Sequence, residues 1–337
     1  MSAVRRRRAI WALAAVLPLL AACATRPSGA GSFSFALMAD QQYTARSAAG
    51  FSAMLEAISQ ENLAFVVHAG DFKAGSSAPC TDALYLQRRA EFERSRHALV
   101  YSPGDNEWVD CRRASNGGYE PLERLAKLRQ VFFARALALG QEPMAVQRQS
   151  DVFAHDPVLG RYSENLLWVH AGVVFATFNI QGSNDNLGFD AAGDREHAER
   201  TRANIAWLKH ALQRADRSDI VALAVFQQAN PGFGHDPRAV ARSGHAEYLR
   251  AFEEMAAALD KPVLFAHGDT HRYRVDRPYV SPMTGRALGN VTRVETWGHP
   301  FVNWVRVTVD PGNRHTPFFI ESGDFSVAGP SLEDPRR

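Results

Sequence analysis

The sequence predicts an α/β protein in which two β-sheets pack face to face and helices cover their outer faces. Short apolar runs alternate with segments of helical periodicity through most of the chain, which is typical of parallel strands joined by helices. Toward the C-terminus the pattern changes to apolar and polar alternation, as in antiparallel strands. With 337 residues, 46% hydrophobic and 22% charged, the chain can bury a full core and does not resemble a disordered protein.

Each element follows from a local pattern. Strands are expected at 33–38, 63–68, 98–102, 166–170, 173–178, 220–226 and 262–266, with antiparallel strands at 291–296 and 301–309 and a further candidate at 317–320. Helices are expected at 47–60, 83–97, 120–139, 198–215 and 245–259. The dipeptide Ala171-Gly172 indicates a hairpin, and residues 140–164 lack periodicity, which suggests an insertion or an irregular crossing segment.

The N-terminus has the pattern of an export signal. Arginines at 5–8 precede an apolar run at 9–20, which is short for a spanning helix, and then Leu20-Ala21-Ala22-Cys23. An ordinary signal peptide cut near Ala22, or a short membrane anchor, would fit. The tetrapeptide also resembles a bacterial lipobox, which implies a signal peptide at 1–22 and lipidation of Cys23. We then expect a tether at 23–32, one domain at 33–325 and a tail at 326–337. The resemblance also implies a lipid-anchored protein of the bacterial cell envelope that faces the periplasm. Because Ala24 is not acidic, the outer membrane is the expected location.

Charge and cysteine content narrow the partners and the compartment. Lys plus Arg is 38 against 36 acidic residues, a net charge of +2, and no basic stripe indicates a nucleic-acid surface. The sequence does not indicate an oligomeric state. Of three cysteines, Cys80 and Cys111 remain after processing at Cys23, and in an oxidising compartment we expect them to form a disulfide; the alternative is two buried free thiols.

Five short segments place polar side chains where a predicted strand ends. They are Asp40-Gln41-Gln42, Gly70-Asp71, Gly104-Asp105-Asn106-Glu107, Phe226-Gln227-Gln228-Ala229-Asn230-Pro231 and Gly268-Asp269-Thr270-His271. Each alone is ordinary turn chemistry, and Asp40 could simply cap a helix. Because loops at the carboxyl ends of parallel strands meet in one crevice, the five together predict a common site.

The order and context of these segments resemble the calcineurin-like metallophosphoesterases. That family's pattern is Asp-x-His, Gly-Asp, Gly-Asn-His-Asp/Glu, a strand ending in His, and Gly-His-x-His. This chain retains Asp40, Asp71, Gly104, Glu107, Gly268 and His271. It carries Gln42, Asp105, Asn106, Gln228 and Asp269 where the family has His, Asn, His, His and His. The resemblance runs from Phe33 to about residue 320 and implies an α/β/β/α sandwich.

The resemblance also implies two divalent metal ions. The first would bind Asp40, Gln42, Asp71 and His271, and the second would bind Asp71, Asp105, Gln228 and Asp269. Four carboxylates replace the family's two, so hard ions such as Mg²⁺, Mn²⁺ or Ca²⁺ are favoured over Zn²⁺. Asn106 stands where the family has the catalytic His that contacts phosphate; an amide can donate a hydrogen bond there but cannot deliver a proton.

Two functional hypotheses follow. The first is a divalent-cation-dependent phosphoesterase that uses a metal-activated water on a small phosphorylated substrate. The alternative is a non-catalytic cation- or phosphate-binding lipoprotein on the same scaffold; an envelope interaction module is a third possibility, but no repeat supports it. Outside the five segments, residues 181–186 could contact substrate or form a polar surface loop. Glu107 is expected to brace its loop, and His68 and His267 are interpreted as structural residues.

Overall fold

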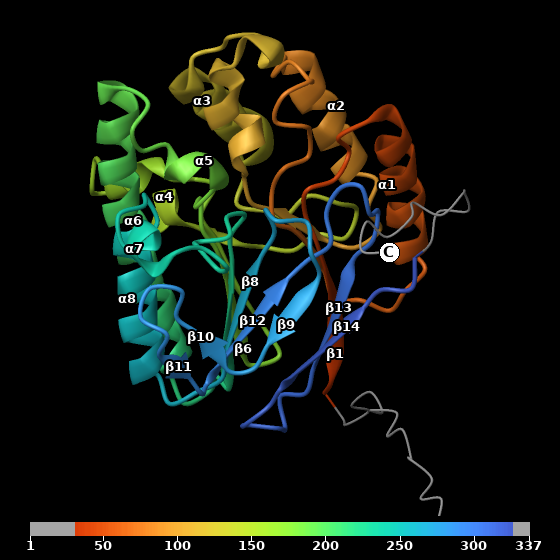
Figure 1. Cartoon of the computed structure of the whole chain (residues 1–337). Helices are drawn as coiled ribbons and strands as arrows, with labels where there is room; N and C mark the ends of the chain where they lie inside the picture. Colours follow the sequence, from red (N-terminus) through yellow and green to blue (C-terminus); the bar gives the residue numbers. More distant parts are fainter. Residues whose placement is uncertain (1–30, 326–337) are drawn as a thin grey trace, which may run out of the picture.

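Two mixed β-sheets form the centre of the molecule in the computed structural model, which describes residues 31–325 (Figure 1). The five-stranded sheet has the order β14 (Phe318–Ser322), β13 (Val305–Val309), β1 (Phe33–Met38), β2 (Val66–His68), β3 (Leu99–Tyr101). The seven-stranded sheet has the order β4 (Gln147–Arg148), β5 (Leu166–His170), β6 (Val173–Thr177), β7 (Ala222–Phe226), β8 (Val263–His267), β12 (Val291–Glu295), β9 (Arg274–Asp276). A separate ribbon pairs β10 (Tyr279–Val280) with β11 (Ala287–Leu288).

Parallel strands dominate the middle of both sheets. In the first sheet β1, β2 and β3 are parallel, and in the second β6, β7, β8 and β12 are parallel. Their carboxyl ends therefore lie at one edge of each sheet, where the loops of an open α/β sheet form binding sites. The predicted antiparallel tail is confirmed, because β13 pairs with β1 and with β14.

Helices lie on the outer faces, as the sequence predicted. They are α1 (Ala45–Ile58), α2 (Asp82–Phe92), α3 (Pro121–Phe132), α6 (Ala191–Ala215) and α8 (Ala246–Ala258), with short helices α4 (Gln149–Val152), α5 (Gly182–Asp185) and α7 (Pro237–Val240). Single turns of 3-10 helix occur at Asp105–Glu107, Val109–Arg112, Ala114–Asn116 and Leu159–Arg161. In Figure 1, α1 and the pair α6 and α8 stand on opposite sides of the sheets. The α/β/β/α sandwich is thus confirmed.

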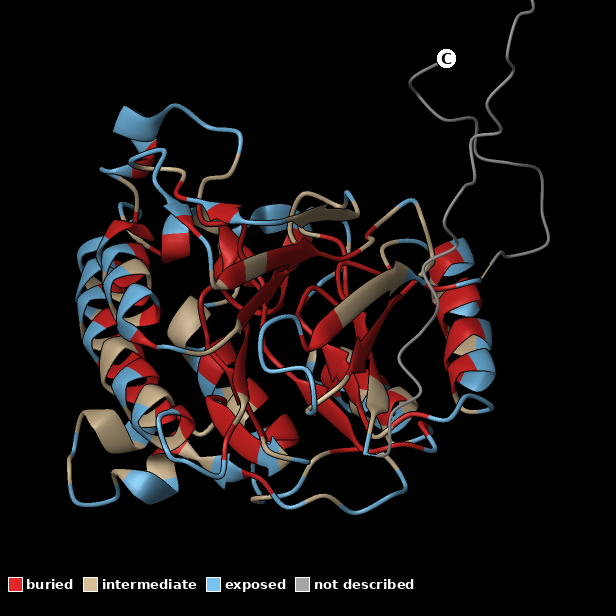
Figure 2. Cartoon of the chain, turned by 90° about the horizontal axis from the view of Figure 1, so that it is seen from below, coloured by how far each residue is buried: buried red, intermediate tan, exposed pale blue. Residues whose placement is uncertain are grey.

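Aromatic side chains fill the space between the sheets. Phe35 of the first sheet packs edge-on against Phe175 and Phe226 of the second, with ring centroids 5.7 and 5.8 Å apart. A second core lies between the seven-stranded sheet and the helices α6 and α8, with Trp207 fully buried. Figure 2 shows the strands buried and the helices buried on their inner faces only. Such burial is the main favourable contribution to folding.

Element boundaries differ from the predictions in a few places. The helix predicted to reach residue 139 ends at Phe132, because Phe133 turns inward and stacks on Tyr101 and Leu139 pairs with Leu99 at the sheet edge. Helix α6 begins seven residues earlier than predicted, since the Asp190 side chain accepts from two backbone amides and caps it. Strands β9, β10 and β11 were not predicted, and the segment 140–164 is largely irregular.

The predictions for the chain ends concern residues outside the described range. These are the signal peptide, the lipidation of Cys23, most of the tether and the tail at 326–337. Within residues 31–325, no helix combines the length and apolar character needed to cross a membrane.

Candidate functional site

The five predicted segments meet at the edge where the parallel strands of both sheets end. The Asp269 amide donates to Asp40 Oδ2 at 2.8 Å, which joins a loop of the second sheet to a loop of the first. The Asn106 amide donates to Asp71 Oδ1 at 3.1 Å, and Gln228 Nε2 donates to Asp71 Oδ2 at 3.1 Å. All five segments therefore belong to one hydrogen-bonded network, as the sequence predicted.

The candidate residues share an uncommon backbone conformation. Asp40, Gln42, Asp71, Asp269 and His271 have φ between 56° and 81°, in the left-handed region. This region is unfavourable for residues with a Cβ, and such residues gather at functional sites where the surrounding structure holds them in place. The strained backbone at these five residues supports a functional role for this edge of the sheets.

Two motif glycines permit the close approach of the carboxylates. A Cβ on Gly104 would overlap Asp71 Oδ1, and a Cβ on Gly268 would overlap Asp40 Oδ2. Only glycine leaves room for a carboxylate to lie directly against the backbone. The close approach of the two carboxylates therefore explains why glycine is required at both of these positions of the family pattern.

Glu107 braces the loops, as expected. Its carboxylate accepts from the backbone amides of Asp71 at 3.2 Å and Gly104 at 2.8 Å, and also from the amide of Phe72. Burial raises the pKa of Glu107 to about 7. Glu107 thus holds the turns after β2 and β3 together and does not face a substrate.

Four buried aspartates repel one another at this edge. Burial raises the pKa of Asp40 and Asp71 well above the usual range, and the neighbouring carboxylates raise it further. Burial also raises the pKa of Asp105, and burial with the charge of Asp105 raises that of Asp269 to about 7. A positive charge placed among these buried carboxylates would stabilise their ionised forms.

A buried lysine supplies part of that positive charge. Lys73 is completely buried, and its Nζ donates to the carbonyls of Ala74 at 2.7 Å and Asn106 at 2.8 Å. Burial lowers its pKa, while Glu107 and Asp71 raise it. Lys73 was missed from the sequence, where its position two residues after Asp71 would have been the only signal.

The Asn106 side chain is occupied by the protein itself. Its Nδ2 donates to the Lys73 carbonyl at 2.9 Å and to the Tyr43 hydroxyl at 3.1 Å. Both amide protons are therefore used, so the expected contact between Asn106 and a phosphoryl oxygen does not fit this arrangement. The nearest group that could replace it is the half-buried Tyr43, whose hydroxyl donates to Asp71 Oδ2 at 3.2 Å.

Tyr43 and His299 form the rim of the site, and the sequence analysis missed both. Their rings stack with centroids 5.3 Å apart, and Tyr43 also meets the His271 ring edge-on at 5.3 Å. Burial raises the pKa of Tyr43 well above 10, so its hydroxyl keeps its proton. Tyr43 directly follows Gln42, and His299 follows the end of β12; these positions at strand ends could have identified them.

The loop at 181–186 belongs to the site and is not a simple surface loop. The Gly182 amide donates to Gln228 Oε1 at 2.7 Å. The Ser183 hydroxyl contacts Asp105 Oδ2 at 2.8 Å and Asp110 Oδ1 at 2.7 Å. The polar atoms of this loop therefore position two candidate ligands.

The residues expected for the first metal ion fit a hard cation. His271 Nδ1 donates to the His299 carbonyl at 2.7 Å, which leaves the lone pair on Nε2; this atom lies 3.4 Å from the Tyr43 hydroxyl and 3.8 Å from Asp40 Oδ1. A hydrogen bond from the other ring nitrogen to a carbonyl orients a histidine that binds a metal ion. Gln42 Nε2 donates to Glu91 at 2.6 Å, and Gln42 Oε1 is buried without a hydrogen-bond partner. Together with Asp71 these are oxygen and imidazole donors suited to Mn²⁺ or Mg²⁺.

The residues expected for the second ion fit less well. Gln228 turns Nε2, which cannot ligate a cation, toward Asp71 and Asp40. Asp105 is engaged by Ser183, and Asp269 Oδ2 accepts from the Asn230 amide at 2.8 Å. Among the described residues, no three His, Cys, Asp or Glu side chains stand in an arrangement that could hold a metal ion, and this applies to Asp40, Asp71 and His271 as well as to the second set.

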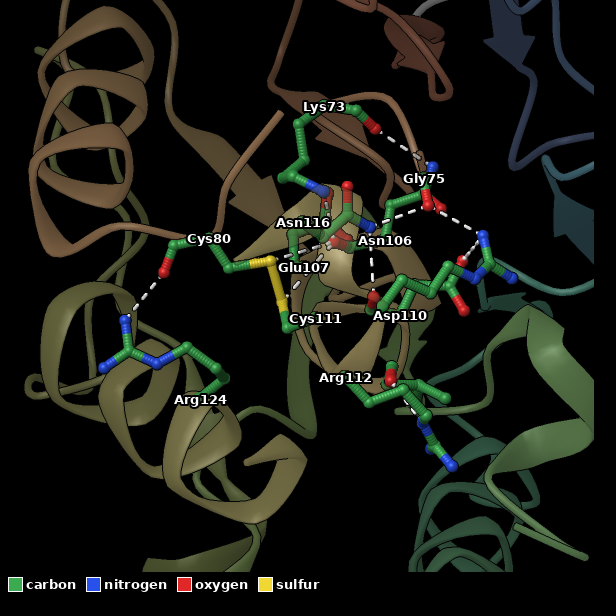
Figure 3. The surroundings of a disulfide bond; sticks show 12 residues. Lys73, Gly75, Cys80, Asn106, Glu107, Asp110, Cys111, Arg112, Asn116 and Arg124 are labelled. Carbon is green, nitrogen blue, oxygen red and sulfur yellow. Dashed lines mark hydrogen bonds and ion pairs between the residues drawn. A yellow bond between two sulfur atoms is a disulfide. The ribbon is translucent and has the colours of Figure 1, made fainter. Parts of the chain in front are cut away.

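The expected disulfide forms next to the candidate site, beside Asn106 (Figure 3). Cys80 and Cys111 are bonded, with Cα atoms 5.8 Å apart and a sequence separation of 31. The bond joins the segment after Lys73 to the helical turns after Asp105, and Figure 3 shows it beside Asn106. It therefore restrains the two segments that carry Lys73 and Asn106.

A profile of the calcineurin-like phosphoesterases matches residues 33–273. The chain belongs to this family. Three solved structures are similar to it. PhoD has 14% identity and a TM-score of 0.53 over 85% of this chain and 65% of that one, so the chain spans slightly less than two thirds of PhoD. A dimetal phosphatase from Danio rerio has 14% identity and a TM-score of 0.48 over 82% of this chain and 92% of that one. GAP50, the anchor in the inner membrane complex of Plasmodium, has 10% identity and a TM-score of 0.45 over 86% of this chain and 88% of that one. No curated protein matches significantly.

Proposed function

We propose that this calcineurin-like phosphoesterase is a divalent-cation-dependent phosphoric ester hydrolase that acts on a small phosphorylated substrate. The observation that carries the proposal is the convergence of Asp40, Asp71 and Asp269 with His271 at one edge. Buried carboxylates in such a group require compensating positive charge, and oxygen donors favour Mg²⁺, Mn²⁺ or Ca²⁺. Family membership supports the reaction class.

A bound cation would supply Lewis-acid stabilisation of the phosphoryl oxygens and a more acidic water. Asp40, Gln42, Asp71 and His271 would hold it. The Tyr43 hydroxyl can turn from Asp71 to donate a hydrogen bond to a phosphoryl oxygen, because Asn106 Nδ2 holds its oxygen in place. Neither the Tyr43 hydroxyl nor the Asn106 amide is an effective proton donor at neutral pH, so we expect a preference for esters with good leaving groups.

The experiment is a hydrolysis assay on aryl phosphate monoesters and diesters with Mg²⁺, Mn²⁺ or Ca²⁺. We expect activity with at least one ion, and we expect Asp71→Asn to lower kcat/KM by roughly 10² or more because Asp71 lies at the centre of the network. Asp194→Asn, the same change at an exposed helical position, is the matched control and should retain activity. Activity absent in every ion, or unchanged in Asp71→Asn, would refute the proposal.

The alternative is a non-catalytic cation- or phosphate-binding protein. One observation favours it: Tyr43 and Gln228 already donate hydrogen bonds to the carboxylates, and both Asn106 amide protons are used. A chain that binds Mn²⁺ yet hydrolyses neither ester class would support this alternative.

We also propose that the chain is a lipoprotein of the bacterial cell envelope, anchored through Cys23 and facing the periplasm. The Leu20-Ala21-Ala22-Cys23 sequence supports lipidation. The Cys80–Cys111 disulfide is consistent with an oxidising compartment.

A further inference from the structure

We infer that the site holds one divalent cation, bound by Asp40, Gln42, Asp71 and His271, and that the amide of Gln228 excludes the second. The inference rests on the proposed cation dependence and departs from the two ions that the family resemblance implies. It concerns the number of ions and the residue that sets it, not the reaction.

Hydrogen bonds at both ends fix the orientation of the Gln228 amide. The Gly182 amide donates to Oε1 at 2.7 Å, so Oε1 must be the acceptor end. The opposite end, Nε2, donates to Asp71 Oδ2 at 3.1 Å and Asp40 Oδ1 at 3.4 Å. An NH₂ group has no lone pair available for a cation, so in this orientation Gln228 is a donor to the bridging carboxylate and not a ligand.

Reversing the amide would be costly. Oε1 would then face two carboxylates, and the NH₂ group would face the Gly182 N–H. A buried donor left without an acceptor is unfavourable. Gln228 is also fully buried, so neither end of the reversed amide could find water as a replacement partner. The orientation is therefore a stable part of the fold.

The other two expected ligands of the second ion are engaged elsewhere. Asp105 Oδ2 contacts the Ser183 hydroxyl at 2.8 Å, and that hydroxyl also contacts Asp110. Asp269 Oδ2 accepts from the Asn230 amide at 2.8 Å. In the first set, Gln42 Oε1 is buried without a hydrogen-bond partner, and His271 Nε2 meets only the Tyr43 hydroxyl at 3.4 Å, which a cation can displace. These two acceptors, which the second set lacks, favour the first set as the site of the cation.

The test is the number of Mn²⁺ ions bound by the full chain, measured by isothermal titration calorimetry and by the electron paramagnetic resonance signal of free Mn²⁺. The wild type should bind one ion. Gln228→Glu keeps the acceptor for the Gly182 N–H and replaces the NH₂ group with a ligand oxygen, so this variant should bind two ions. Spin coupling between neighbouring Mn²⁺ ions should appear only in this variant.

Two further variants complete the experiment. Gln228→His supplies the family's imidazole and should also bind two ions, which keeps the test valid if the additional carboxylate of Gln228→Glu prevents folding. Gln213→Glu makes the same change at an exposed position of α6, away from the site, and should still bind one ion.

The outcomes are distinct. Two ions in the wild type, or none, would overturn the inference. One ion in the wild type and also in every folded Gln228 variant would show that Gln228 does not set the number. One ion in the wild type without ester hydrolysis would sink the proposed function and leave this inference standing.

Discussion

At the scale of single residues, three amides replace imidazoles in this site, and each behaves differently. Gln42 has a buried, unpartnered Oε1; Asn106 uses both amide protons on protein acceptors; and Gln228 donates to two carboxylates. An amide has a donor end and an acceptor end, so its neighbours decide which end faces the site. Substitution of His by Gln or Asn therefore has no single consequence.

The buried His68 makes stability depend on pH. It packs against Phe51, Phe92 and Tyr101, and burial lowers its pKa from 6.5 to about 3. Below pH 6.5 the unfolded chain binds a proton that the folded chain does not, so the contribution of His68 is complete above pH 6.5 and is lost as the pH falls toward 3. Between pH 7 and 5 we expect the wild type to lose about 2 kcal/mol more unfolding free energy than His68→Phe.

Urea unfolding of both proteins at the two pH values measures this difference. Any pH-independent loss caused by the substitution cancels, because each protein is compared with itself. Equal losses for wild type and His68→Phe would show that His68 takes up its proton in the folded state.

At the scale of elements, the residues of the site lie in the loops that follow the strands. Two loops of the first sheet are held together by Glu107, and the Cys80–Cys111 disulfide restrains the segments on either side of them. The disulfide closes a chain segment of 31 residues, so its loss increases the entropy of the unfolded chain.

We expect the double variant Cys80→Ser/Cys111→Ser to lose about 3 to 4 kcal/mol of unfolding free energy. Equilibrium denaturation in urea measures the loss. Wild type treated with a thiol reductant is the matched control and should reach the same midpoint as the variant. A variant as stable as the oxidised wild type would contradict the prediction.

At the scale of the whole molecule, two sheets bring together residues that lie 231 positions apart, from Asp40 to His271. Backbone hydrogen bonds such as the His299 amide to the Asp40 carbonyl, at 2.7 Å, join the edges of the sheets directly. The site therefore exists only when both sheets have folded and packed.

The proposed anchor is also a property of the whole chain. Expressed in a bacterial host with labelled palmitate, the wild type should carry label and sediment with membranes, whereas Cys23→Ser should lose the label. Cys80→Ser/Cys111→Ser, which removes the other two cysteines, should remain labelled. An unlabelled wild type, or a labelled Cys23→Ser, would refute lipidation at Cys23.

Most of the fold could be predicted, because period-two and helical patterns of apolar residues report directly on burial. Errors occurred where tertiary contacts override a local pattern, as at Phe133, or where strands such as β9 are very short. Positions at strand ends predicted the segments of the site. Tyr43 and His299 also lie just after strand ends and could have been proposed from those positions. The role of Lys73 could not, because it depends on its contact with the Asn106 carbonyl in another loop.

The sequence by itself determined the sandwich, the family and the edge at which Asp40, Asp71 and His271 meet, because strand order and side-chain type are local properties of the chain. The tertiary structure alone decided what each polar group faces. Gln228 Oε1 receives the Gly182 amide from a loop 46 residues away, and this contact turns the NH₂ group toward Asp71. Hydrogen-bond direction is a property of the packed neighbours, so no pattern in the sequence contains it.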